Sequence, residues 1–85
     1  MEHMEVQFDF VEKNGGACVT KILSPGAACV IPETLSGLPV TELGDKALAQ
    51  TGVEEVFLPR TLRRLGRYCF YGCERLSHIH FYGGP

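Results

Sequence analysis

The chain has 85 residues, of which 45% are apolar and 21% charged, and this composition is typical of one small folded domain rather than a disordered protein. The formal net charge is -2 and the isoelectric point is about 5.8, which argues against nucleic-acid binding because nucleic-acid-binding domains are usually basic. The opening segment MEHMEVQFDF lacks a signal-peptide pattern, and no stretch approaches the ~18 apolar residues of a membrane span, so we expect neither signal-directed export of this chain nor membrane insertion.

Residues 1–27 are predicted to form an N-terminal β-hairpin. Apolar and polar residues alternate in VQFDF, residues 6–10, as they do in a half-buried strand. Asn14, Gly15 and Gly16 then tolerate the positive φ angles of a tight turn, and a second strand is expected at residues 18–22. We expect this hairpin to cap a stack of repeats, because the end of such a stack exposes apolar surface.

Beyond the hairpin, several segments recur at nearly constant spacing. The recurring pairs are Leu43–Leu48 with Leu65–Phe70, Val53–Leu58 with Leu76–Phe81, and Ile31–Thr34 with Leu58–Thr61. The first two pairs have offsets of 22 and 23 residues, and the third has an offset of 27 because residues 35–40 are inserted. A period of 22 to 23 falls within the ~20 to 29 residues of a leucine-rich repeat.

Two stretches, IPETLSGLPVTELGDKALAQTGVEEVFLP and LPRTLRRLGRYCFYGCERLSHIHF, resemble the units of BspA-like leucine-rich repeats. These units read approximately IP-x-x-(l-x-G-x-P-V)-T-x-I-G-x-x-A-F-x-G-C-x-x-L-x-x-V-x-I-P. Leu48 replaces the usual Phe and Cys69 the usual Ala. The resemblance implies a mainly β fold with short helical connectors, with about two repeats in residues 28–82 and a tail at 83–85. It also implies a bacterial or other microbial surface or secreted protein that functions in adhesion.

Three aligned strands are expected in this region, and the alternation of their side chains predicts which residues face outward. The strands are Ala28–Ile31, Glu55–Leu58 and His78–Phe81. Their inward positions are Cys29, Ile31, Val56, Leu58, Ile79 and Phe81. Their outward positions include the predicted partner-binding surface, which consists of Val30, Glu55, Phe57, His78 and His80. Phe57 is the main indication of a binding surface, because a large apolar side chain on an exposed strand face suits contact with a partner. Two alternatives are that Phe57 is a lone exposed ring or that the N-terminal hairpin covers it.

The segments between the strands are expected to form short helical connectors. Residues 45–50 and 67–71 are too short for independent helices but suit single helical turns that place Leu48 and Phe70 in the core. Asp45 would be the N-cap of the first connector.

Basic residues concentrate toward the C-terminus. Residues 1–58 contain nine carboxylates and three lysines, a formal charge of -6, whereas residues 59–85 contain five arginines and one glutamate, a formal charge of +4. Arg60, Arg63, Arg64 and Arg67 are expected to form a basic patch in a turn. They either carry solvated charge or bind an acidic partner.

A metal site is the main alternative to a binding surface. Cys69, Cys73, His78 and His80 have a spacing that could suit zinc. Because the histidines should face outward while Cys73 faces the core, we predict no metal site, no cofactor and four free, buried cysteines. The sequence also lacks the Gly-x-Ser-x-Gly, phosphate-loop and His-Glu-x-x-His motifs, and we do not expect an enzyme.

The predicted function is a non-catalytic protein-interaction or adhesion module that uses the outward strand face. The alternative is an architectural cap, a spacer or a self-assembling segment without an external ligand. Since no following repeat would cover the last apolar layer, we also expect self-association through the C-terminal repeat.

Overall fold

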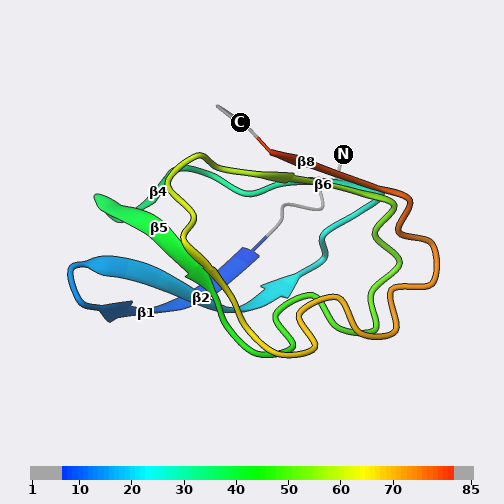
Figure 1. Cartoon of the computed structure of the whole chain (residues 1–85), viewed down its shortest axis with the longest axis horizontal. Coiled ribbons are helices and arrows are strands. Elements are labelled where there is room, and N and C mark those ends of the chain that lie inside the picture. The colour runs from blue at the N-terminus through cyan, green and yellow to red at the C-terminus, as the bar shows by residue number, and fades with distance from the viewer. Residues whose placement is uncertain (1–6, 82–85) are drawn as a thin grey trace, which may run out of the picture.

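The computed structural model describes residues 7–81, and these residues form a short solenoid of β-strands without a helix (Figure 1). One circuit of the chain around the solenoid is called a coil below. Among the described residues there is no helix with the length and hydrophobicity needed to cross a membrane. The strands are β1 Gln7–Lys13, β2 Gly16–Leu23, β3 Ala28–Val30, β4 Thr34–Leu35, β5 Leu38–Leu43, β6 Glu55–Leu58, β7 Arg64–Leu65 and β8 His78–Phe81.

β1 and β2 form an antiparallel hairpin whose turn contains Asn14 and Gly15, with φ angles of 53° and 81°. Phe8 and Phe10 are half-buried and pack against the core. β2 also pairs in parallel with β5, so backbone hydrogen bonds join the hairpin to the solenoid. The predicted strand pairing is therefore present within the described residues, while the function of the hairpin as a cap remains a prediction. Val6, which begins the predicted alternation, lies outside the described residues.

β3, β6 and β8 form a parallel three-stranded sheet in the register expected from the repeat. Cys29 pairs with Val56, and Val56 pairs with Ile79. In the neighbouring position, Val30 pairs with Phe57, which in turn pairs with His80. The predicted alignment of the three strands is confirmed.

A second sheet follows the order β1-β2-β5-β4, and β7 also pairs with β5. The recurring Leu-Gly pair lies here, because Leu43 of β5 pairs with Leu65 of β7. The inserted residues 35–40 fold back as the β4–β5 hairpin, whose turn residues Ser36 and Gly37 have φ angles of 51° and 81°. Strands β4, β5 and β7 were not predicted from the sequence.

The predicted helical connectors are wrong. Residues 45–50 and 67–71 instead form turns that lie one above the other in successive coils. The backbone N–H groups of Lys46, Leu48 and Gln50 donate to the carbonyl oxygens of Arg67, Cys69 and Tyr71 at 2.9, 3.0 and 2.6 Å. These donors are consequently unavailable for helical hydrogen bonds within their own segment.

Backbone angles in the same turns also oppose a helix. Lys46, Gln50 and Tyr68 have φ angles of 60°, 60° and 56°, which lie in the left-handed region. The predicted N-cap at Asp45 is wrong for the same reason, since Asp45 precedes no helix. Its Oδ1 atom instead accepts a hydrogen bond of 2.7 Å from the backbone N–H of Arg67 in the next coil.

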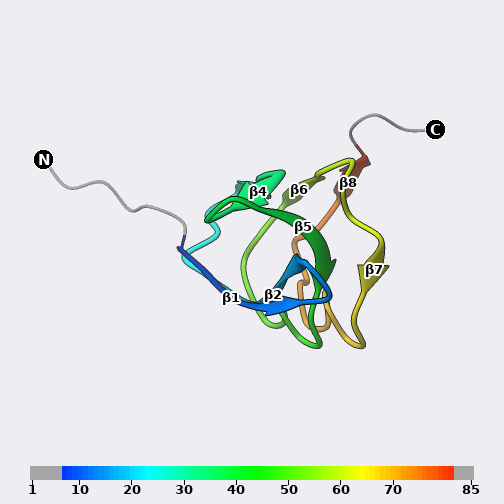
Figure 2. The same cartoon turned by 90° about the vertical axis from the view of Figure 1, so that its left-hand side faces the viewer.

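The core lies inside the coils, which follow one another side by side in Figure 2. Leu48 is fully buried as predicted, whereas Phe70 is only partly buried against the core. Ile79 and Phe81 have the expected inward register but are 40% and 67% exposed, because no further coil among the described residues covers them. The fully enclosed side chains include Ile22, Ile31, Leu43, Leu48, Leu58, Val19, Val40, Val53, Val56 and Cys29.

Candidate functional site

The candidate site is the outward face of the parallel sheet formed by β3, β6 and β8. The register aligns Val30, Phe57 and His80, one from each strand, and this set is called the aromatic row below. Neighbouring strands in a sheet are ~4.8 Å apart, so these side chains contact one another across the sheet. Val30 is 54% exposed, and Phe57 and His80 are half-buried. The row thus presents apolar and aromatic surface to the solvent.

Ring stacking orders this row. The rings of Phe57 and His80 are stacked with their centroids 4.3 Å apart and their planes 9° apart. The rings of His80 and His78 follow with centroids 5.9 Å apart and planes 14° apart. Because stacking restricts the side chains before any partner binds, less conformational entropy is lost on binding.

Polar groups border the aromatic row on one side. Glu55 of β6 pairs with His78 of β8, which is exposed and lies 3.0 Å from Ser77 through its Nδ1 atom. The Nε2 atom of His80 is enclosed and has no hydrogen-bond partner among the described residues. The polar contacts of this face are therefore offered by Glu55 and His78 and not by the Nε2 atom of His80.

The four residues with zinc-like spacing do not come together. Cys69 belongs to the core cluster and is 4% exposed, and the Cys73 thiol donates a hydrogen bond of 3.0 Å to the carbonyl oxygen of Leu48. The two histidines lie on the outer face of the parallel sheet. Within the part of the chain that the structure describes, no three His, Cys, Asp or Glu residues are placed to hold a metal ion.

The cysteines of the described region are free, and three of the four are buried. Burial raises the pKa of Cys29 to about 11 and that of Cys69 to about 11. The pKa of Cys18 is also raised, first by burial and then by the nearby carboxylate of Glu42. These thiols are protonated at neutral pH, which makes them poor nucleophiles and poor metal ligands.

We expect protein purified without a chelator to contain no stoichiometric zinc. Addition of EDTA should leave the melting temperature unchanged, because the candidate ligands lie in separate environments. Elemental analysis and a thermal melt check this expectation. One zinc ion per chain, lost together with stability in EDTA, would show that the cysteines and histidines do converge.

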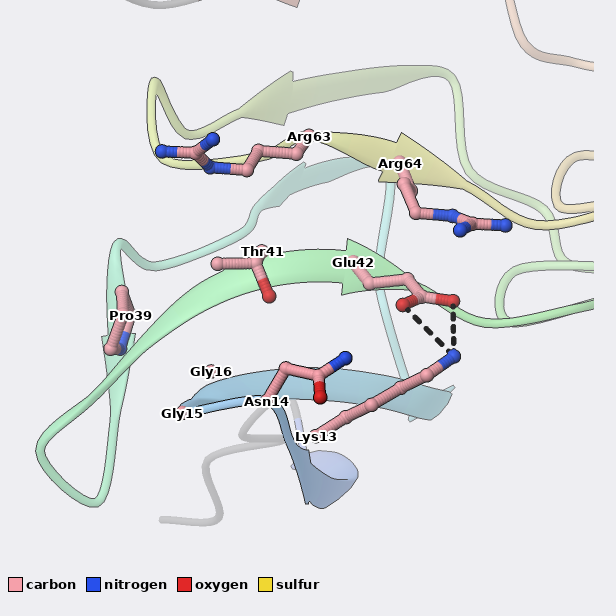
Figure 3. Close-up of a pocket in the computed structure, with 9 residues that line it drawn as sticks. All are labelled: Lys13, Asn14, Gly15, Gly16, Pro39, Thr41, Glu42, Arg63 and Arg64. Atoms are coloured by element: carbon pink, nitrogen blue, oxygen red, sulfur yellow. Dashed lines mark hydrogen bonds and ion pairs between the residues drawn. The ribbon is translucent and has the colours of Figure 1, made fainter.

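The four arginines of the predicted basic patch have different surroundings. Arg60 forms an ion pair with Glu33, with 2.9 Å between Nε and Oε2. Arg63 and Arg64 line a groove of about 400 Å³ together with Lys13 and other residues of β5 and of the β1–β2 turn (Figure 3). Arg67 does not line this groove. Sequence reasoning missed the groove because Lys13 is far from the arginines in the chain.

An exposed pair of tyrosines was also missed. Tyr68 and Tyr71 are 63% and 60% exposed, and their rings meet edge to face with centroids 5.8 Å apart. Their segment was predicted to be a helical connector, and no binding surface was predicted there. The sequence signal for this exposed pair was two tyrosines three positions apart between Gly66 and Gly72.

Solved structures with similar folds are leucine-rich repeat proteins from bacteria. A Treponema pallidum leucine-rich repeat protein superposes with a TM-score of 0.83 and 33% identity, over 86% of this chain and 36% of that one. A Bacteroides capillosus leucine-rich repeat protein superposes with a TM-score of 0.80 and 26% identity, over 87% of this chain and 60% of that one. A Bacteroides ovatus leucine-rich repeat protein superposes with a TM-score of 0.70 and 25% identity, over 93% of this chain and 22% of that one.

This chain therefore has the leucine-rich-repeat fold, which is typically non-enzymatic and associated with protein interaction. It spans 36%, 60% and 22% of the lengths of these three proteins. No protein-family model and no curated protein sequence matches it.

Proposed function

We propose that the chain is a non-catalytic protein-interaction module that binds a protein partner through the outward face of β3, β6 and β8. The aromatic row carries this proposal, since it is an ordered, partly exposed set of apolar and aromatic side chains on a regular sheet. The proposed contact residues are Val30, Glu55, Phe57, His78 and His80.

The composition of the face supports a protein as the partner. Protein interfaces combine a centre enriched in aromatic residues with a polar rim. Phe57 lies between Val30 and His80, and Glu55 and His78 form one polar border. The resemblance to BspA-like repeats leads us to propose adhesion as the biological role, with a location at the bacterial cell surface or outside the cell.

Binding of the whole chain to a panel of immobilised extracellular-matrix proteins tests this proposal. Surface plasmon resonance should detect binding to at least one of them, and Phe57→Ser should weaken that binding by about tenfold or more, as expected for a central aromatic contact. Tyr68→Ser is the control, because it removes an aromatic ring that is exposed on the stacked turns and not on this face.

His80→Ser serves as a second variant in case Phe57→Ser disturbs folding, which circular dichroism would reveal. Equal weakening by the control and the outward-face variants would contradict the proposed surface. Absence of binding to every protein of the panel would contradict adhesion.

Exposed apolar residues at the last coil favour a second candidate function, a self-assembling or architectural segment. Leu65, Ile79 and Phe81 are 47%, 40% and 67% exposed. Two copies placed end to end about a two-fold axis would bury this layer on both chains, although they would also bring arginine-rich ends together. An architectural cap or spacer would have no external ligand.

We expect sedimentation velocity over a concentration series to show a dimer. Phe81→Ser should shift the equilibrium toward the monomer, because it removes the most exposed apolar side chain of this layer. Val11→Ser, which changes an exposed apolar residue of β1, should leave the equilibrium unchanged. A monomeric mass at every concentration would contradict self-association.

A further inference from the structure

A second surface, the groove beside β7, has the chemistry of a site for an acidic ligand. It lies against the sheet that contains β2, β5 and β7, whereas the aromatic row belongs to the other sheet. The groove residues come from three places, which are the end of the β1–β2 hairpin, strand β5 and the start of β7 (Figure 3).

The charges of the groove are unbalanced. Its lining contains three cationic side chains, Lys13, Arg63 and Arg64, and one carboxylate, Glu42. Lys13 and Glu42 form an ion pair, with 3.3 Å between Nζ and Oε1. Within residues 7–81, neither arginine side chain forms a hydrogen bond or an ion pair. Two exposed guanidinium groups are thus available to an anionic ligand.

The two arginines diverge along the groove. In Figure 3 the side chain of Arg63 extends toward the end near Pro39, and that of Arg64 extends toward the Lys13–Glu42 pair. A single small anion would not contact both guanidinium groups in this arrangement. A ligand that carries anionic groups at separate points along an extended chain would contact both guanidinium groups.

Neutral polar groups lie between these charges. The Asn14 amide and the Thr41 hydroxyl line the same groove, and Figure 3 shows both side chains in its middle part. An amide and a hydroxyl can exchange hydrogen bonds with peptide groups, while each guanidinium fork suits a carboxylate.

We propose that the groove binds an extended acidic segment of a protein, with carboxylates that pair separately with Arg63 and Arg64. This surface is independent of the outward strand face, so the chain would contact a partner at two sides of the solenoid or contact two different partners.

Fluorescence anisotropy with a short labelled peptide of alternating glutamate and glycine tests the groove at physiological salt. We expect measurable binding, and we expect the double variant Arg63→Gln/Arg64→Gln to weaken it by about tenfold or more, since both charge-assisted contacts are lost. The double variant Arg67→Gln/Arg75→Gln is the matched control, because it removes the same charge from exposed positions outside the groove. Its effect should be less than about threefold, as expected for long-range charge screened by salt.

Further arms of the experiment identify the ligand class. A peptide of alternating glutamine and glycine should not bind, and inorganic phosphate should not displace the acidic peptide. The variant Phe57→Ser should leave binding of the acidic peptide to the groove unchanged. Equal weakening by the two double variants would overturn the proposal, because binding would then follow net charge alone. Absence of peptide binding, or tighter binding of a sulfated oligosaccharide with the same dependence on Arg63 and Arg64, would also overturn it.

Discussion

Val56→Asp is expected to leave the chain unfolded at room temperature. Val56 is fully buried in the middle strand of the parallel sheet, between Cys29 and Ile79. A carboxylate placed there has no partner, and an unpaired buried charge costs several kcal/mol, which is comparable to the ~5 kcal/mol stability of a marginal small domain. Loss of the far-UV circular dichroism signal of the folded state and of amide chemical-shift dispersion would report the unfolding.

Val30→Asp is the matched control for this change. It makes the same substitution on the adjacent strand, at an outward position where the side chain is 54% exposed. The charge remains hydrated there, so the loss of unfolding free energy should be below about 1 kcal/mol in a urea titration. Equal damage from the two variants would mean that the inward and outward assignments of these strands are wrong.

Gly66→Ala should cause the second-largest loss of stability, because successive coils come very close at this point. A Cβ atom on Gly66 would lie 2.5 Å from the backbone nitrogen of Asp45 and 2.5 Å from the carbonyl carbon of Gly44. It would also lie 2.6 Å from Asp45 Oδ1, which accepts the hydrogen bond of Arg67. Relief requires the coils to separate, and we expect a loss of about 3 kcal/mol in a urea titration, at the upper end for overpacked sites.

Gly52→Ala separates this effect from a general effect of replacing glycine. A Cβ atom on Gly52 would have no neighbour within 4 Å, and this residue does not have a positive φ. Its replacement should be neutral or slightly stabilising, because alanine reduces the entropy of the unfolded chain. If Gly66→Ala were as mild as Gly52→Ala, the coils would have to be farther apart than the structure places them.

The part of the fold that follows from the repeat could be predicted from the sequence. The recurring segments align Cys29 with Val56 at an offset of 27 residues and Val56 with Ile79 at an offset of 23, because each coil must bury the same positions as its neighbour. Alternation along each strand then assigns Val30, Phe57 and His80 to the outer face. The recurring Leu-Gly pair also marks the close contact of the coils at Gly66, although its pairing as a strand was not recognised.

The connectors could not be predicted because their stability comes from the neighbouring coil. Lys46 and Leu48 donate to carbonyl oxygens that are more than twenty positions away in the chain, and a local helical pattern contains no such information. The short strand β7 likewise exists only through its pairing with β5. Sequence patterns report periodicity within a segment, whereas these elements depend on contacts between segments.

The two candidate sites, the aromatic row and the groove, also differ in whether the repeat predicts them. The aromatic row was predictable because its three members occupy the same position in successive repeats. The groove was not, since it joins Lys13 of the hairpin to Arg63 and Arg64, and no period connects these residues. The predicted patch of four arginines contains two of these groove residues and omits the lysine.

The alignment of the aromatic row on the outer face underlies both the fold and the proposed function, and nuclear Overhauser effects in solution test it most directly. With ring centroids of Phe57 and His80 at 4.3 Å, their ring protons should show strong cross peaks, and those of Phe57 should also reach the methyl groups of Val30. Cross peaks from the Phe57 ring to the core side chains Ile31 and Leu48, without contacts to His80, would place this ring inside the solenoid and contradict the account.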